Sequence, residues 1–220
     1  NLHRIMKVII IGSSGHAKVI IDAINKGGHS QVVGLIDDFR EVGETTLNIP
    51  VIGKVNDIEA HKELNCGWII GIGDNKQRHR VFSKLMELRL NYINVIHPSA
   101  IIGNDVNIGI GNFIAAGTII NSGTSIGNHC IVNTGAQLDH DNTLHDFVSI
   151  APKAALAGNV TIERGSYIGM GANVIEKITV ARQTVIGAGS VVTHDIPRFK
   201  VAYGVPCKEI RSRNMEETFL

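Results

Sequence analysis

The hydrophobic positions of the second half of the chain repeat with a period of six residues. Every sixth position from 96 to 192 holds isoleucine, leucine or valine. One aliphatic residue in six, with glycine and other turn-forming residues between, is typical of a parallel β-helix, whose inward aliphatic side chains stack into one core. With three sides to a coil, or about 18 residues, residues 96–197 predict between five and six coils. The 17 positions are Ile96, Ile102, Ile108, Ile114, Ile120, Ile126, Val132, Leu138, Leu144, Ile150, Leu156, Ile162, Ile168, Val174, Val180, Ile186 and Val192.

The first part of the chain has a different pattern, in which strand-length apolar runs alternate with helix-length segments. Residues 7–12 and 31–38 are expected to be buried strands, and residues 16–28 between them a helix that glycine ends. Residues 67–73 predict a further buried strand, followed by a helix over 74–90 whose first two residues, aspartate and asparagine, are good caps. Strands and helices in this order predict a parallel sheet with right-handed crossovers.

Two domains are therefore expected, an α/β domain over residues 1–94 and an all-β domain with a C-terminal tail over residues 95–220. Charged residues make up 19% of the chain, which is a globular composition. Its 21 basic and 20 acidic residues give a net charge of +1, without a long basic run. This charge indicates neither nucleic acid nor an anionic membrane as a partner. Small molecules and other copies of the chain are the expected partners.

The sequence favours a reduced, cytoplasmic environment. The apolar run near the N-terminus, residues 8–12, is far too short to span a bilayer and has no signal-peptide pattern around it. The three cysteines, Cys66, Cys130 and Cys207, lie far apart and form no CxxC pair. We expect neither a disulfide framework nor a zinc knuckle from this spacing.

Acidic side chains and two histidines gather in the stretch VNTGAQLDHDNTLHDF, residues 132–147. His140 follows the inward Leu138 by two residues, so it is expected at a corner of the β-helix, pointing away from the core. An imidazole there can accept a proton at neutral pH, and the neighbouring carboxylate of Asp141 can fix its tautomer and favour the imidazolium. The alternative interpretation is a solvated corner histidine without a catalytic role.

The uninterrupted repeat resembles the left-handed β-helix acyltransferases. Three motifs, IVNTGAQLDHD (131–141), IAPKAALAGNV (150–160) and YGVPCKEI (203–210), are similar to those of one subgroup. That subgroup comprises the bacterial N-acetyltransferases of nucleotide-linked 4-amino sugars and the sialic-acid O-acetyltransferases. The resemblance implies left-handed coiling, a homotrimer with active sites between adjacent β-helices, acetyl-CoA as co-substrate and no metal.

The resemblance also implies roles for individual residues of the β-helix. His140 corresponds to the proposed general base of the subgroup, Asp141 to the acid that orients it, and Asn133 to a residue close to the acceptor. Ser149 stands where the subgroup often has a second histidine that contacts acetyl-CoA, and we favour Ser149 over His145 for a weaker form of that contact. The other residues implied for acetyl-CoA are Gly158, Ala188, Gly204, Pro206 and Lys208.

The N-terminal domain carries a weaker signal, the loop GSSGHA at residues 12–17, which follows a strand and opens a helix. Backbone N–H groups bind phosphate at such a position, although the loop is not the dinucleotide fingerprint. Asp37 and Asp38 end the next strand, where an acid often accepts from a ribose hydroxyl, or where it only forms a turn. By resemblance this half-Rossmann domain holds the nucleotide of the amino sugar. The residues implied are Gly12, Ser13, Gly15, His16, Asp37, Asp38, Gly73, Asn75 and Arg78.

Four alternatives to the N-acetyltransferase remain at this point. A sugar or sialic-acid O-acetyltransferase has the same fold and histidine. An NAD-dependent dehydrogenase would use the same N-terminal loop, but no hydride-transfer domain follows it. A zinc enzyme of the γ-carbonic-anhydrase type would need His129, His140 and His145 on one face, which their spacing does not favour. A pure scaffold would not need the acidic histidine corner, and the pattern does not identify the sugar or its nucleotide.

Overall fold

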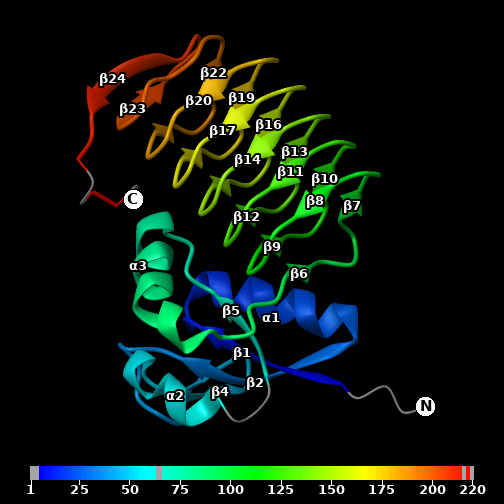
Figure 1. Ribbon diagram of the computed structural model, residues 1–220, viewed down its shortest axis with the longest axis vertical. Coiled ribbons are helices and arrows are strands. Elements are labelled where there is room, and N and C mark those ends of the chain that lie inside the picture. Colours follow the sequence, from blue (N-terminus) through cyan, green and yellow to red (C-terminus); the bar gives the residue numbers. More distant parts are fainter. Residues whose placement is uncertain (1–4, 63–65, 215–216, 219–220) are drawn as a thin grey trace.

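The computed structural model describes residues 5–62, 66–214 and 217–218, which form an α/β part and a β-helix (Figure 1). The α/β part is built on a sheet with the strand order β3-β4-β2-β1-β5. Strands β1, β2, β4 and β5 are parallel along this order, and β3 is antiparallel to β4. The strands are β1 (Met6–Ile11), β2 (Ser30–Ile36), β3 (Thr45–Thr46), β4 (Ile49–Gly53) and β5 (Gly67–Ile70).

Two longer helices accompany this sheet, and their ends follow local capping chemistry. Helix α1 (Gly15–Gly27) ends where Gly28 takes a left-handed conformation, φ 71°, and donates its N–H to Ile24. Helix α3 (Asn75–Leu85) begins after Asp74, whose side chain accepts from the N–H of Gln77. The shorter helical segments are η1 (Val55–Asp57), α2 (Ile58–His61) and η3 (Met86–Leu88). The predicted strand and helix order is present, with the helix predicted over 74–90 divided between α3 and η3.

The β-helix consists of two-residue strands, and each of the 17 periodic aliphatic residues is the second residue of one strand. Strands pair in parallel with strands one coil away, 18 residues along the chain, as Ile119 pairs with Gln137. The first side contains β6 (Val95–Ile96), β9 (Phe113–Ile114), β12 (Ile131–Val132), β15 (Ser149–Ile150), β18 (Tyr167–Ile168) and β21 (Val185–Ile186). The second contains β7 (Ile101–Ile102), β10 (Ile119–Ile120), β13 (Gln137–Leu138), β16 (Ala155–Leu156), β19 (Asn173–Val174) and β22 (Val191–Val192). The third contains β8 (Asn107–Ile108), β11 (Ser125–Ile126), β14 (Thr143–Leu144), β17 (Thr161–Ile162) and β20 (Thr179–Val180).

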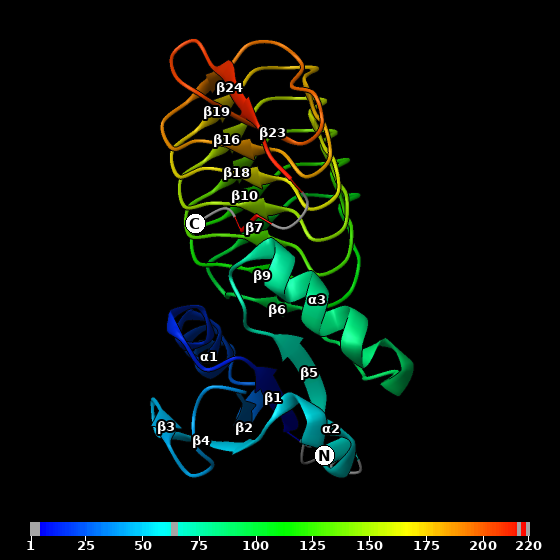
Figure 2. The same cartoon turned by 90° about the vertical axis from the view of Figure 1, so that its left-hand side faces the viewer.

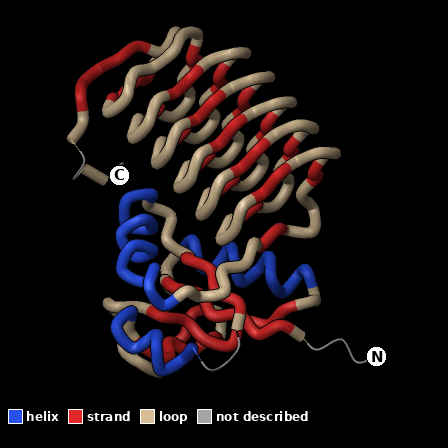
Figure 3. Tube along the Cα trace, in the orientation of Figure 1, coloured by secondary structure: helices blue, strands red, loops and turns tan. Residues whose placement is uncertain are grey.

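Residues in the left-handed backbone conformation turn the corners of the coils. The corner after the second side holds Asp105, Gly123, Asp141, Asn159 and Lys177, each 18 residues from the next and with φ between 55° and 76°. Asn, Asp and Gly adopt this conformation more readily than other residues, which explains most of these identities. The regular stacking of the coils is visible in the view turned by 90° (Figure 2) and in the tube, where short strands alternate with turns (Figure 3). The predicted fold class, an α/β domain followed by a left-handed parallel β-helix, is confirmed.

Fourteen of the 17 periodic aliphatic residues form one continuous buried core, and the three of the first coil do not belong to it; Ile108 is partly buried and packs against this core. Ile96 is 40% exposed and Ile102 is 36% exposed. Both lie at the end of the stack, where no further coil covers them. The expectation that all 17 aliphatic residues are inside is therefore wrong for this coil.

The α/β part and the β-helix share a second core. Side chains of α1, among them Ile20 and Ile24, pack with Val95, Phe113 and Ile131 of the first side of the β-helix. Figure 1 shows α1 between the sheet and the first coils, with α3 beside the coils. At the far end, β23 (Lys200–Tyr203) extends the first side and pairs with β24 (Lys208–Ser212) in an antiparallel manner. Among the helices described, none has the length and apolar character that crossing a membrane requires.

Candidate active site

His140 lies at the corner that follows strand β13, and its ring contacts the carboxylate of the next residue. Nδ1 is 2.8 Å from Oδ2 of Asp141. The side chains are 54% and 57% exposed, so the pair is open to a ligand. Because a carboxylate only accepts hydrogen bonds, this contact places the proton on Nδ1 and leaves the lone pair of the neutral ring on Nε2. No hydrogen bond to Nε2 is found within the described ranges.

The surroundings of His140 favour its protonated form. Its pKa is raised, chiefly by the hydrogen bond to Asp141; desolvation is the next effect and opposes the rise, and the negative charges of Asp139, Asp141 and Glu176 each add a smaller increase. Asp139 accepts from the side-chain N–H of Asn121 at 3.0 Å and from the backbone N–H of His140 at 2.9 Å. These bonds, with that from Asn121 the strongest cause, lower the pKa of Asp139 and hold it as an anion. The corner is thus a histidine base surrounded by carboxylates.

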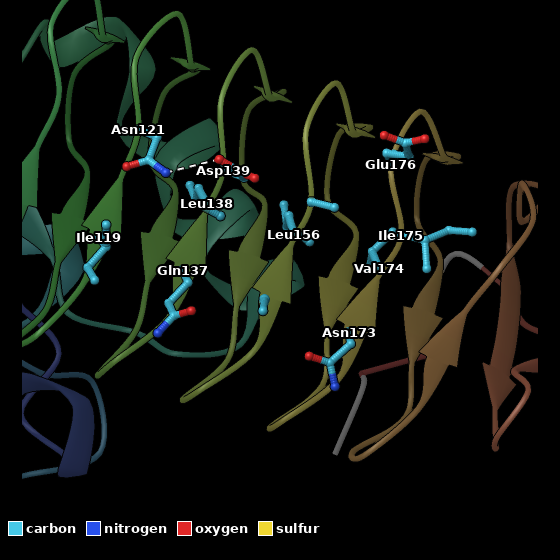
Figure 4. Close-up of a pocket in the computed structure, with 12 residues that line it drawn as sticks. Ile119, Asn121, Gln137, Leu138, Asp139, Leu156, Asn173, Val174, Ile175 and Glu176 are labelled. Atoms are coloured by element: carbon cyan, nitrogen blue, oxygen red, sulfur yellow. Dashed lines mark hydrogen bonds between the residues drawn. The ribbon is translucent and has the colours of Figure 1, made fainter.

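A groove runs beside this corner, along the outer surface of the second side of the β-helix. It crosses strands β10, β13, β16 and β19, with Gln137 and Asn173 among its polar side chains and Ile119 and Leu156 among its apolar ones (Figure 4). Asp139 and Glu176 lie at its border on the His140 corner. An extended ligand with polar and apolar segments fits this lining.

The residues implied for the acceptor and acetyl-CoA lie in three places: the corner before β13, the His140 corner, and the far coils with the tail. Asn133 lies at the corner before β13, with its Oδ1 2.8 Å from the N–H of Thr134, so strand β13 separates it from His140. Gly158 lies on the His140 corner, one coil further along. The remaining residues lie at the far coils and in the tail: Ala188 is exposed, Gly204 has φ 111°, Pro206 follows a cis peptide bond and Lys208 is exposed. The structure therefore brings His140, Asp141 and Gly158 together, and holds the others apart from them.

Three residues predicted to contact ligands are instead buried between α3 and the β-helix. Arg78 is 1% exposed and donates to the backbone oxygens of Ile72, Gly73 and His129 and to the side chain of Asn75. Burial lowers the pKa of Arg78 to about 10, so it stays a cation at neutral pH. All its N–H groups point into the protein, which corrects the expectation that it lines the nucleotide site.

Asn75 and Ser149 belong to the same network. Ser149 donates from Oγ to Oδ1 of Asn75 at 2.5 Å and accepts from Arg78 at 3.0 Å. Asn75 donates to the backbone oxygens of Gly165 and Ser166. Each is 3% exposed, and Ser149 lies on the first side of the β-helix, away from the groove on the second side. Their positions correct both expectations, that Ser149 contacts acetyl-CoA and that Asn75 contacts the nucleotide.

The carboxyl ends of β1 and β2 bring the glycine-rich loop and Asp37 together. Gly12 has φ 111°, and a Cβ there would lie 2.9 Å from the backbone oxygen of Gly71. Ser13 donates from Oγ to Oδ2 of Asp37 at 2.5 Å. Gly15 opens α1 at an exposed position, with no atom near the place of its missing side chain. Backbone N–H groups at the start of α1 therefore face open space beside a carboxylate, an arrangement suited to a phosphate next to a sugar hydroxyl.

The other residues predicted for the nucleotide have structural partners. Asp38 accepts from the backbone N–H of Val55 at 2.8 Å and so orders the turn before α2. His16 packs its ring edge against Phe113, with centroids 5.3 Å apart. Burial, with a smaller effect of Arg78, lowers the pKa of His16 to about 3, so it is neutral. Gly73 lies beside His16 and accepts from Arg78.

Two acidic residues of the site were not predicted, although the sequence contains a signal for one of them. Glu176 is 36 residues after His140, two coils on, and occupies the same place on the corner. Counting in steps of 18 from a candidate base would have found it. Asp139 was visible only as one of several acids in the stretch. As for the zinc alternative, the described part of the chain holds no group of three or more His, Cys, Asp and Glu residues that could bind a metal.

Comparisons with known proteins agree with this architecture. A model of the PglD N-terminal domain matches residues 7–85. GDP-perosamine N-acetyltransferase of Escherichia coli O157:H7 is 33% identical over 120 residues, 54% of this chain and 54% of that enzyme. Galactoside O-acetyltransferase of Lactococcus lactis is 34% identical over 116 residues, 51% of this chain and 55% of that enzyme. The chain thus spans about half the length of these curated relatives.

Solved structures match over nearly the whole chain. A histidine-to-alanine mutant of GDP-perosamine N-acetyltransferase from Caulobacter crescentus, in complex with CoA and GDP-perosamine, is 35% identical with a TM-score of 0.90, covering 95% of this chain and 99% of that one. The acetyltransferase domain of PglB from Neisseria gonorrhoeae is 31% identical with a TM-score of 0.88, covering 93% and 99%.

Proposed function

Because the chain belongs to the family of hexapeptide-repeat acetyltransferases with a PglD N-terminal domain, we propose that it is an acetyl-CoA-dependent N-acetyltransferase. Its acceptor is the 4-amino group of a nucleotide-linked amino-deoxy sugar. The Caulobacter relative binds CoA and GDP-perosamine, which supports both substrate classes. The observation that carries the proposal is the exposed pair of His140 and Asp141 beside the groove, with no hydrogen-bond partner of Nε2 among the described residues.

In the reaction, the sugar amine attacks the thioester carbonyl and forms the new C–N bond. His140 accepts the amine proton at Nε2, and Asp141 stabilises the imidazolium through the hydrogen bond at Nδ1. The C–S bond then breaks, and the imidazolium returns its proton to the leaving thiolate. Proton transfer of this kind contributes about 10² to 10⁴ in rate, and holding amine and thioester in attack geometry contributes the rest.

The nucleotide part of the sugar binds at the carboxyl edge of the α/β sheet. Backbone N–H groups of the loop from Gly12 to Gly15 hold phosphate at the start of α1, and Asp37 accepts from a ribose hydroxyl. The pantetheine chain of acetyl-CoA lies in the groove of the β-helix, toward Ala188 and Gly204. These two substrates imply a cytoplasmic enzyme.

The active site is completed by a neighbouring chain in a homotrimer. The groove is open along the outer surface of a single β-helix, so one chain alone leaves a bound coenzyme largely in water. Asn133 and His140 are also separated by strand β13, and a second β-helix brings an equivalent of one corner opposite the other. Light scattering should therefore give a particle of about three times the 23.7 kDa of the chain. A monomer with full activity would rule out the shared site.

The reaction is tested with a panel of nucleotide-linked 4-amino sugars and free sialic acid, each with acetyl-CoA, by following the release of free thiol. We expect release with one or more amino sugars and an amide in the product mass spectrum. Release with sialic acid alone would assign the chain to the O-acetyltransferases. No release with any acceptor, from a correctly folded protein, would reject the proposed acceptor class.

A further inference from the structure

Gly158 occupies a special place on the corner that carries His140. It follows His140 by 18 residues, and its coil is stacked directly on that of His140, as the backbone bond from the N–H of Asn159 to the oxygen of His140 shows. A Cβ added at Gly158 would lie 2.5 Å from Cε1 and 2.6 Å from Nε2 of His140. These distances are far shorter than van der Waals contact, so the imidazole occupies the volume that a side chain at position 158 would fill.

The backbone gives no other reason for glycine at this position. The φ of Gly158 lies outside the left-handed range, unlike that of Gly123 on the same corner or Gly165 on another, and any residue can adopt its conformation. The atoms that come closest to the added Cβ are all ring atoms of His140. What position 158 requires is therefore space for the ring.

We propose that Gly158 is a positioning residue for His140: because position 158 has no side chain, the imidazole can lie along the stacking direction, with Nδ1 on Asp141 and Nε2 over Gly158. This inference rests on the proposed function of His140 as the base. It differs from the role that the resemblance implies for Gly158, which is close passage of the pantetheine chain.

The charged groups around His140 show how the position of the ring affects its pKa. Asp139 and Asp141 lie on its own coil, and Glu176 lies one coil beyond Gly158. With glycine between them, no side chain separates the imidazole from Glu176. All three carboxylates raise the pKa of His140, the largest effect being the hydrogen bond to Asp141. A methyl group at position 158 displaces the ring from Asp141 and weakens that effect.

The test is Gly158→Ala in the full-length protein, with Gly27→Ala as the matched control. Gly27 is the last residue of α1, has an ordinary φ, and has no atom within 4 Å of an added Cβ. For Gly158→Ala we expect kcat to fall by about tenfold to a hundredfold, as for a misplaced catalytic group. The affinity for CoA should stay within about twofold, because ground-state binding does not need the base. Gly27→Ala should leave both unchanged.

Two further measurements distinguish the two possible roles of Gly158, making space for the His140 ring or letting the pantetheine chain of the coenzyme pass. An NMR titration of the His140 ring, assigned by comparison with His140→Ala, should show a lower pKa in Gly158→Ala than in the wild type. Adding Gly158→Ala to His140→Ala should cause no further loss of kcat, and any drop in melting temperature caused by Gly158→Ala should disappear once the ring is removed. The NMR titration and the melting temperatures need no sugar, so they remain informative if the proposed acceptor is wrong.

An unchanged His140 pKa, together with more than tenfold weaker CoA binding in both the wild-type and the His140→Ala backgrounds, would overturn the inference. Gly158 would then serve the coenzyme rather than the base.

Discussion

The left-handed conformation of Asp141 is what lets the side chains of two adjacent residues, His140 and Asp141, form one hydrogen-bonded pair. Neighbouring residues of an extended strand point to opposite sides, so His140 and Asp141 could not meet within a strand. Asp141 has φ 57° and turns the corner, which places its Oδ2 2.8 Å from Nδ1 of His140. Aspartate tolerates this conformation better than most residues. One residue can therefore both form the turn and orient the imidazole of His140.

Replacing the base gives the first prediction. His140→Ala removes the proton acceptor, and we expect kcat to fall by about 10² to 10⁴ while CoA affinity and melting temperature stay close to those of the wild type. Steady-state kinetics and calorimetry measure these quantities. His145→Ala is the control, because His145 lies on another corner, beyond strand β14. Near-wild-type turnover of a folded His140→Ala protein would show that the base has been misassigned.

The pH profile gives the second prediction. His140 must be neutral to accept a proton, and its pKa is raised by Asp141, so kcat/KM should fall as the pH drops through an apparent value above 6.5. Asp141→Asn removes the largest cause of the shift, and the acidic limb should move to lower pH with a smaller loss of plateau rate than in His140→Ala. A limb at the same pH in both proteins would mean that another group controls it.

The two aspartates after β2 give the third prediction, because the structure distinguishes them. Both accept a hydrogen bond from a backbone N–H, Asp37 from Phe39 and Asp38 from Val55, but only Asp37 also accepts from Ser13 of the glycine-rich loop among the described residues. Asp37→Ala should raise the KM for the nucleotide sugar and leave that for acetyl-CoA unchanged, as measured by initial rates. Asp38→Ala should mainly lower the melting temperature. Equal increases in both KM values for Asp37→Ala would make that residue structural.

The sequence was more informative about the position of His140 than about the arginine network. His140 stands out because its position relative to Leu138 places it at a corner whatever the rest of the chain does. Arg78, Asn75 and Ser149 meet only because α3 docks on the first side of the β-helix. That contact joins residues 71 positions apart, and no local pattern encodes it. The sequence therefore contained no sign that Arg78 bonds to backbone oxygens and to the side chains of Asn75 and Ser149.

At the scale of elements, the six-residue period determined the β-helix almost completely. All 17 periodic positions end a strand, because an aliphatic side chain on each side is what the stacked core requires. The period does not contain information on how the stack ends. Ile96 and Ile102 follow the pattern as well as Ile150 does, yet they lie on the open end of the stack.

This difference within the repeat gives the fourth prediction. Ile150 is fully buried in a central coil, so Ile150→Asp places an unpaired charge in the core and should prevent cooperative folding. Ile102→Asp makes the same change at a position that is 36% exposed and should be much better tolerated. Circular dichroism melts of the two variants make the comparison. A cooperative melt of Ile150→Asp near the wild-type temperature would contradict the core assignment.

At the scale of the molecule, the contact between α3 and the β-helix contains a buried cation, Arg78, beside a cluster of aromatic rings, in addition to the core that α1 shares with the first coils. Arg78 of α3 bonds to the backbone of His129, and the ring of His129 stacks on Phe147 one coil away at an interplanar angle of 13°. Phe82 of α3 and Tyr92 pack around the same ring. The interface therefore orients the α/β domain on the coils before and after the His140 corner, and the relative position of the two proposed substrate sites depends on it.

The histidines of this interface give the last prediction, which concerns stability in acid. Burial, assisted by Arg78, lowers the pKa of His129 to about 4 and that of His16 to about 3. In the unfolded protein both histidines bind a proton below about pH 6.5. In the folded protein they stay neutral until the pH falls to about 4 and about 3. Their contribution to stability is complete above about pH 6.5 and is lost as the pH falls toward 4 and 3.

Phenylalanine at position 129 keeps an aromatic ring and removes this proton, so His129→Phe should reduce the slope of unfolding free energy against pH by up to about 1.4 kcal/mol per pH unit between pH 6 and pH 4.5. Urea denaturation at a series of pH values measures the slope, and a substitution of the exposed His29 serves as the control. If His129→Phe and the wild type lost stability in parallel, His129 would have to be protonated or solvated in the folded interface, and the dry aromatic contact between the domains would be wrong.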